Sequence, residues 1–240
     1  MPANLTTKER KIDIIFVMDG TGSMSPCIDK IKANAIKFYK DFVDKMTNEY
    51  SSNVEELNIK VITFRDYGYD GKKSMEISEG WFEITGGDDT LFEDHLKTIV
   101  AQGGGDDPEN GLEALYYAMT SDWKANGDND RQIIVLFSDT NALPLKNRAG
   151  NADYPENMVD EAGLLNTWMC LKPEFVGQSD FKLKERCKRL VMFAPAGTVY
   201  EKMQQEYNRS VFTPVKMDAG LRDIDFDDII KIIAASASSV

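Results

Sequence analysis

Three oxygen-bearing side chains alternate with glycine in the short segment Asp19-Gly-Thr-Gly-Ser23. The glycines let the backbone turn sharply, so the carboxylate of Asp19 and the hydroxyls of Thr21 and Ser23 can point toward one centre. Such oxygens are hard ligands that suit Mg²⁺ or Mn²⁺, and also Ca²⁺, better than zinc. The chain has one histidine and three scattered cysteines, so a site of nitrogen or sulfur is hard to build. The segment therefore predicts a divalent metal site made of oxygen ligands.

Two further polar segments carry acidic residues. Gly105-Asp-Asp-Pro-Glu109 precedes a predicted helix, and Ser138-Asp-Thr140 directly follows the predicted strand Ile133–Phe137. In an open α/β sheet, ligands bind beyond the carboxyl ends of the strands, near the point where the strand order reverses. We therefore expect both segments to lie at the same edge of the sheet as Asp19.

Strand and helix signals alternate along the chain. Ile12–Met18 is a short apolar run typical of a strand buried on both faces, and Ser25 and Pro26 then favour the start of a helix. Further strands are predicted at 59–64, 75–82, 133–137, 190–193 and 210–213, with helices at 91–100, from about 107, at 153–171, at 199–207 and from about 226.

This order of elements predicts an α/β fold. We expect a doubly wound, mostly parallel central sheet flanked by helices on both faces, with one short antiparallel edge strand. Residues 1–10 are predicted to form an N-terminal tail, and residues 11–240 a single domain.

The charge of the chain limits its expected partners. The formal net charge is −12, and an acidic surface repels both the phosphate backbone of nucleic acid and anionic membranes. No apolar run approaches the roughly 20 residues of a membrane helix, and no signal peptide is evident, so a cytoplasmic location is expected. Cys27, Cys170 and Cys187 have no spacing typical of a disulfide framework and are expected to be reduced.

The segment Val17-Met-Asp-Gly-Thr-Gly-Ser-Met24 resembles the DxSxS motif of von Willebrand factor A-type domains, with threonine in place of the first serine. The resemblance implies a Rossmann-like fold over about residues 10–235 and a metal-ion-dependent adhesion site. In that family the site is completed by a threonine from a later loop and by an aspartate at the end of the fourth strand, which Asp139 matches. The later loop here lacks the threonine and is similar to a GGGDxPE variant, in which an acidic residue can fill the same role.

Two aspartates of this loop are candidates for the missing ligand. Asp107 directly precedes Pro108, the expected first residue of the helix, so its side chain suits an N-cap. This favours Asp106 as the ligand, with Asp107 as the alternative, while a capping role for both is the structural explanation. Asp66, Asp107 and Thr140 are further candidates to contact metal-bound water. For Asp66, a simple ion pair or an exposed strand end is the favoured alternative.

The resemblance implies protein recognition, in which an acidic residue of a partner protein fills an open position on the metal ion. Bacterial and cytosolic members of the family often act as scaffolds in signalling or stress-response systems. The alternative is a Mg²⁺-dependent phosphohydrolase similar to haloacid dehalogenases, which also use an aspartate at a strand end. Their second aspartate corresponds here to Thr21, and the only histidine, His95, belongs to no hydrolase motif, so catalysis is not expected.

Overall fold

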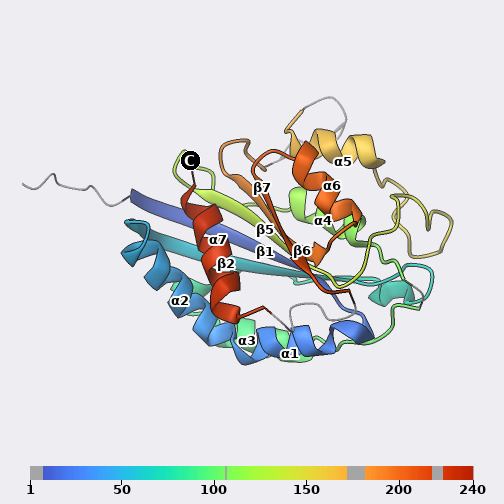
Figure 1. Ribbon diagram of the computed structural model, residues 1–240, viewed down its shortest axis with the longest axis horizontal. Helices are drawn as coiled ribbons and strands as arrows, with labels where there is room; N and C mark the ends of the chain where they lie inside the picture. Colours follow the sequence, from blue (N-terminus) through green and yellow to red (C-terminus); the bar gives the residue numbers. More distant parts are fainter. Residues whose placement is uncertain (1–7, 106, 172–181, 218–223, 240) are drawn as a thin grey trace, which may run out of the picture.

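The computed structural model describes residues 8–105, 107–171, 182–217 and 224–239, which form a central sheet between two layers of helices (Figure 1). The sheet has seven strands, six of them in the order β3-β2-β1-β5-β6-β7, and β4 also pairs with β2. The strands are β1 (Lys8–Asp19), β2 (Ser52–Phe64), β3 (Met75–Ile77), β4 (Phe82–Glu83), β5 (Arg131–Phe137), β6 (Lys188–Pro195) and β7 (Ser210–Val215).

The five longer strands run parallel, and the two short strands β3 and β4 run antiparallel to β2. The predicted α/β class, with its mostly parallel sheet, is therefore confirmed. The antiparallel edge expected at 75–82 is present as two short strands rather than one.

The first strand begins earlier than the sequence suggested. Lys8 pairs with Ser52, and the pairing continues to Arg10 and Val54, so residues 8–10 belong to the sheet and not to the predicted N-terminal tail. Arg10 is buried, and its guanidinium is stabilised there by the hydrogen bonds that it donates to the carbonyl oxygens of Asn129 at 2.9 Å and Ala237 at 3.3 Å. These contacts hold a polar strand end that has no apolar signal of its own.

The helices cover both faces of the sheet, as predicted. One layer consists of α1 (Ser25–Ala33), α2 (Ala35–Asn48), α3 (Asp89–Thr98) and α7 (Phe226–Ser238), and the other of α4 (Gly111–Met119), α5 (Glu161–Trp168) and α6 (Val199–Glu206). Successive side chains of a strand point to opposite faces. Ile14 and Phe16 of β1 therefore pack in the first layer, and Ile15 and Val17 in the second.

The strand order reverses between β1 and β5. The chain passes from β1 to β2 on one side and reaches β5, on the other side of β1, only later. The carboxyl ends of β1 and β5 thus lie side by side, which places the segments after Asp19 and Phe137 next to each other. Across the four described ranges, no helix is long and apolar enough to span a membrane.

Candidate metal centre

Asp19 is the last residue of β1, and its side chain is completely buried. Its Oδ1 accepts hydrogen bonds from the amide of Thr21 at 3.0 Å and from the Thr21 hydroxyl at 2.7 Å. Its Oδ2 accepts a bond from the Ser138 hydroxyl at 3.1 Å. Burial raises the pKa of the Asp19 carboxyl to about 7, and the negative charge of Asp139 adds to this shift, whereas the hydrogen bonds oppose it. The partners of this buried carboxyl group in the described residues are thus hydroxyl and amide groups.

The hydroxyl groups of the glycine-rich segment join Asp19 to the second strand end. Thr21 Oγ1 lies 3.2 Å from Ser23 Oγ, and Ser23 Oγ in turn donates to Oδ1 of Asp139 at 3.2 Å. Asp139 and Thr140 follow β5 and are both buried. Thr140 belongs to a tight turn, in which its amide donates to the Ser138 hydroxyl at 3.3 Å. Four predicted ligands, namely Asp19, Thr21, Ser23 and Asp139, therefore converge in one cluster.

The second loop differs from the sequence prediction. Helix α4 begins at Gly111, with Asn110 rather than Asp107 at its N-cap position, and Asp107 is exposed. The proposed N-cap role of Asp107 is therefore wrong, because the chain between Pro108 and Asn110 is extended along a neighbouring loop before the helix starts. Asp106, the favoured ligand, lies outside the described residues.

Glu109 is the acidic residue that this loop directs into the protein. It is 1% exposed, and neither of its carboxylate oxygens has a hydrogen-bond partner within the described part of the chain. Burial raises the pKa of Glu109 to about 9, and the charges of Asp19 and Asp66 contribute. A buried carboxyl group without a partner is costly, so this position is suited to a cation.

The position of Glu109 depends on backbone pairing with the loop that follows β5. Its amide donates to the carbonyl of Asn141 at 3.3 Å, and its carbonyl accepts from the amide of Leu143 at 2.7 Å. Glu109 was not among the candidate ligands predicted from the sequence. The sequence signal for Glu109 is its place as the final residue of the GGGDxPE pattern, which the predicted early start of the helix obscured.

Glycines 103, 104 and 105 bring the second loop close to the first. All three have positive φ angles, of +74°, +99° and +50°, which glycine adopts without steric cost. A Cβ atom on Gly104 would lie 2.6 Å from Cγ2 of Thr21 and 2.8 Å from Oε1 of Glu109. The backbone of Gly104 therefore touches both Thr21 and Glu109, which places these two candidate ligands on the same side of the loop.

Arg65 links the loop after β1 to the loop that carries the three glycines. Its buried guanidinium donates to the carbonyl oxygens of Gly20 at 3.0 Å, of Gln102 at 2.9 Å and of Val100 at 3.0 Å. The backbone adds a bond from the amide of Gln102 to the carbonyl of Gly20 at 3.0 Å. Gly20, which precedes Thr21, and Gln102, which precedes the triglycine segment, are thus both bonded to the Arg65 side chain.

Asp66 forms the ion pair that was favoured over a contact with metal-bound water. Its buried carboxylate accepts a hydrogen bond from Nε of Arg148 at 2.7 Å and a second, shorter one from Nη2 of the same guanidinium. It also accepts from the amide of Gly68 at 2.6 Å. This bidentate pair fixes the long loop after β5 against the end of β2.

The donor set fits a hard cation only if hydroxyl groups take part. In the ranges that the structure describes, no three His, Cys, Asp or Glu side chains are gathered closely enough to hold a metal ion. The carboxylates of Asp19, Glu109 and Asp139 would therefore not all contact one ion directly, and the hydroxyls of Thr21 and Ser23 and water would complete its coordination. Mg²⁺ commonly binds in this way, through a few protein oxygens and several retained waters.

Comparisons with known proteins support the fold alone. No family model matches the chain, and no curated protein matches its sequence. A crystal structure of the pilus adhesin SpaC from Lactobacillus rhamnosus GG has a TM-score of 0.50 at 13% identity, and an open conformation of the same protein has a TM-score of 0.49 at 11% identity. Proximal thread matrix protein 1 from the mussel byssus has a TM-score of 0.48 at 12% identity.

The chain spans less than half of each of these proteins. The matches cover 93% to 95% of this chain but 46% of the mussel protein and 30% or 31% of the adhesin. The adhesin structure with a TM-score of 0.50 is similar to this chain in its α/β architecture.

Proposed function

We propose that this chain is a metal-dependent protein-binding module of the von Willebrand factor A type. A divalent ion would be held, partly through water, by Asp19, Thr21, Ser23 and Asp139, with Glu109 in place of the threonine that the family supplies from its second loop. An acidic residue of a partner protein would fill a remaining position on the ion. A carboxylate is a suitable ligand because it supplies a charged oxygen to a hard cation.

The observation that carries this proposal is the pair of buried carboxyl groups with raised pKa values, Glu109 at about 9 and Asp19 at about 7. Both lie at the edge where the strand order reverses, and the Glu109 oxygens have no partner in the described residues. A bound cation would lower both pKa values and compensate the buried charges.

The residues around the cluster supply little for catalysis. Thr21 stands where the acid/base aspartate of a haloacid dehalogenase-like enzyme would be. His95 lies on α3, where its ring packs against Phe82 with centroids 5.2 Å apart, and burial lowers its pKa. Protein binding is therefore preferred to phosphate hydrolysis. Release of product from p-nitrophenyl phosphate in the presence of Mg²⁺, lost on Asp19→Asn, would reverse this preference.

The test is metal titration of protein previously treated with EDTA. Calorimetry with Mn²⁺ or Mg²⁺ should show one site that disappears in Asp19→Ala. Asp128→Ala is the matched control, because the Asp128 side chain is 87% exposed and pairs only loosely with Arg186 at 3.5 Å. Absence of metal binding in the wild type, or equal binding in Asp19→Ala, would refute the metal site.

The open position can be tested separately. Bound Mn²⁺ enhances the relaxation of water protons, and a carboxylate that replaces water should reduce this effect. Peptides with one glutamate are expected to do so, whereas the same peptides with glutamine are not. If glutamate and glutamine peptides behave alike while Mn²⁺ still binds, the metal site stands but carboxylate recognition fails.

A further inference from the structure

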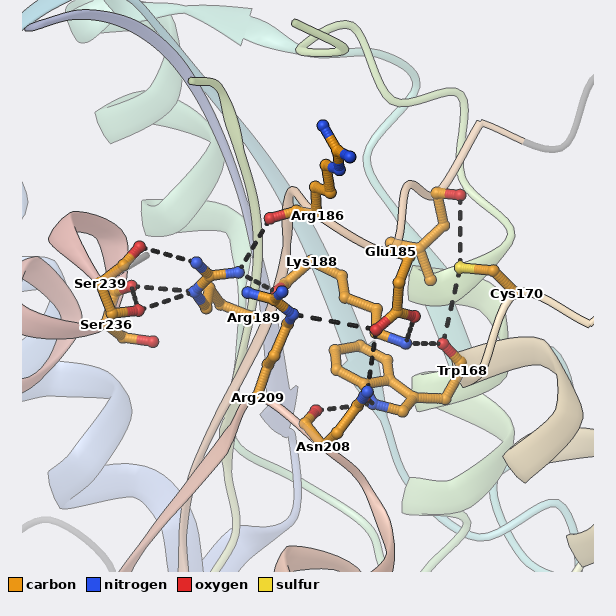
Figure 2. A network of polar contacts seen from close by, with 11 residues as sticks. Trp168, Cys170, Glu185, Arg186, Lys188, Arg189, Asn208, Arg209, Ser236 and Ser239 are labelled. Atoms are coloured by element: carbon orange, nitrogen blue, oxygen red, sulfur yellow. Dashed lines mark hydrogen bonds and ion pairs between the residues drawn. The ribbon is translucent and has the colours of Figure 1, made fainter. Parts of the chain in front are cut away.

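A cluster of arginine side chains lies at the amino ends of the strands, opposite the candidate metal centre. Figure 2 shows one of them, Arg189, with its contacts to Ser236 and Ser239. Arg10, Arg131 and Arg189 belong to the neighbouring strands β1, β5 and β6 and are 3%, 4% and 2% exposed. Three buried cations side by side are unusual in a chain with a net charge of −12.

Part of this cluster has a clear structural role. Arg189 donates to the carbonyl of Ser236 at 3.2 Å and to that of Ser239 at 2.7 Å, and Arg131 donates to the carbonyl of Ser239 at 2.6 Å. These bonds cap the carboxyl end of α7, where a helix carries a partial negative charge. The partial charge of one helix end is smaller than the charge of three guanidinium groups.

The lowered pKa values of Arg131 and Arg189 indicate that the positive charge of the cluster is only partly compensated. Burial lowers the pKa of Arg131 to about 9 and that of Arg189 to about 10, and repulsion from neighbouring arginines contributes to both shifts. The Nε atoms of Arg10 and Arg131 are buried and have no hydrogen-bond partner among residues 8–105, 107–171, 182–217 and 224–239. The carboxylates of Asp130 and Glu185 offset part of this charge at Arg10 and Arg189, and the arginine-rich side of the cluster suits an anion.

A cavity opens beside this cluster. It has a volume of about 420 Å³ and lies between the start of β7 and the last turns of α7. Its polar lining comes from Arg189, Arg209, Ser210 and Ser239, and its apolar lining from Val211, Ile232 and Ala235. Cavities of this size can enclose a small organic molecule.

Arg209 is the cavity residue best placed to bind such a molecule. Its side chain is 31% exposed and forms a long ion pair with Glu185, in which Nε lies 3.8 Å from Oε1, and its guanidinium donates no hydrogen bond among the described residues. Glu185 is already bonded by Lys188 and by Asn208, as Figure 2 shows. Arg209 also has a φ of +58°, a conformation that is uncommon for a residue other than glycine and that concentrates at functional sites.

We propose that this cavity binds a small amphipathic carboxylate, with its charged end at Arg209 and its apolar body against Val211 and Ile232. The planar guanidinium matches the two oxygens of a carboxylate, and the apolar wall disfavours a fully hydrated inorganic anion. The site is independent of the metal centre, because it lies at the other end of the strands.

The test uses octanoate as the probe and 1-octanol and acetate as matched controls, titrated into the full chain. Octanoate should bind at one site and shift the methyl resonances of Val211 and Ile232, whereas octanol lacks the charge and acetate lacks the apolar body. Arg209→Gln should weaken octanoate binding roughly tenfold. Absence of octanoate binding, or octanol or acetate binding as tightly as octanoate, would overturn the proposal.

Two further variants separate binding from folding. Arg186→Gln removes the same charge from the same surface, but Arg186 does not line the cavity and its side chain is 75% exposed, so octanoate binding should be unchanged. Ala235→Trp should fill the cavity and abolish binding while leaving every arginine in place. If Arg209→Gln and Ala235→Trp are folded and still bind octanoate as the wild type does, the assignment is wrong.

Discussion

Replacing Glu109 with glutamine should stabilise the metal-free protein and abolish its response to metal. A carboxyl group with a raised pKa holds a proton in the folded state that it releases in the unfolded state. Folding therefore becomes less favourable as pH rises from the ordinary pKa of 4.5 toward the folded pKa of about 9. At about pH 7.5 this interval is about three pH units, which corresponds to about 4 kcal/mol.

Glutamine removes this cost but leaves a buried amide without a described partner, which reduces the gain. We expect Glu109→Gln to raise the free energy of unfolding by about 2 kcal/mol at about pH 7.5. The gain should shrink toward zero at about pH 5, where little of the ionisation cost is present in the wild type. The measurement is urea unfolding at both pH values, with EDTA and with excess Mg²⁺.

The metal response separates this explanation from a general effect on packing. Excess Mg²⁺ should stabilise the wild type but not Glu109→Gln. Asp107→Asn is the control from the same loop, and because Asp107 is exposed it should retain the Mg²⁺ response. Asp106→Asn tests the ligand that the sequence favoured. If Glu109→Gln lowers the stability and keeps the full Mg²⁺ response, the assignment of Glu109 is refuted.

Three other predictions concern the same edge of the sheet. Because the pKa values of Asp19 and Glu109 are raised, the metal-free protein should lose stability in urea unfolding from about pH 5 to pH 8, and protection by Mg²⁺ should grow over this range as protons compete less with the ion. Gly104→Ala should cost about 1–3 kcal/mol and weaken Mg²⁺ binding in calorimetry, whereas Gly22→Ala, whose Cβ would meet nothing within 4 Å, should change stability by less than about 1 kcal/mol. Arg148→Gln should cost about 3–5 kcal/mol by removing the ion-pair partner of buried Asp66, and the double variant with Asp66→Asn should regain much of this loss in a double-mutant cycle.

The sequence predicted the parts of the site whose geometry is local. Asp19, Thr21 and Ser23 lie within five residues of one another, and the strand before them has a strong apolar signal. Asp139 follows an equally clear strand, and parallel pairing of two strands brings their ends together. Alternation of strands and helices was also sufficient to predict the α/β class.

The parts that were missed depend on contacts distant in sequence. Glu109 turns inward because its backbone pairs with Asn141 and Leu143, about 30 residues later, and no local pattern encodes this pairing. The same pairing delays the start of α4 to Gly111, which invalidated the N-cap argument for Asp107. The strand start at Lys8 likewise depends on partners in β2.

The buried guanidinium of Arg65 has a consequence for the speed of ion binding. Because one side chain holds the carbonyls of Gly20 and Gln102 together, the loops that bear the candidate ligands are already assembled before an ion arrives. Ion entry should then depend on loss of hydration water and not on loop closure. Mg²⁺ gives up its water reluctantly. Mn²⁺ is therefore expected to load faster than Mg²⁺ in stopped-flow mixing, even where the two ions bind with similar affinity.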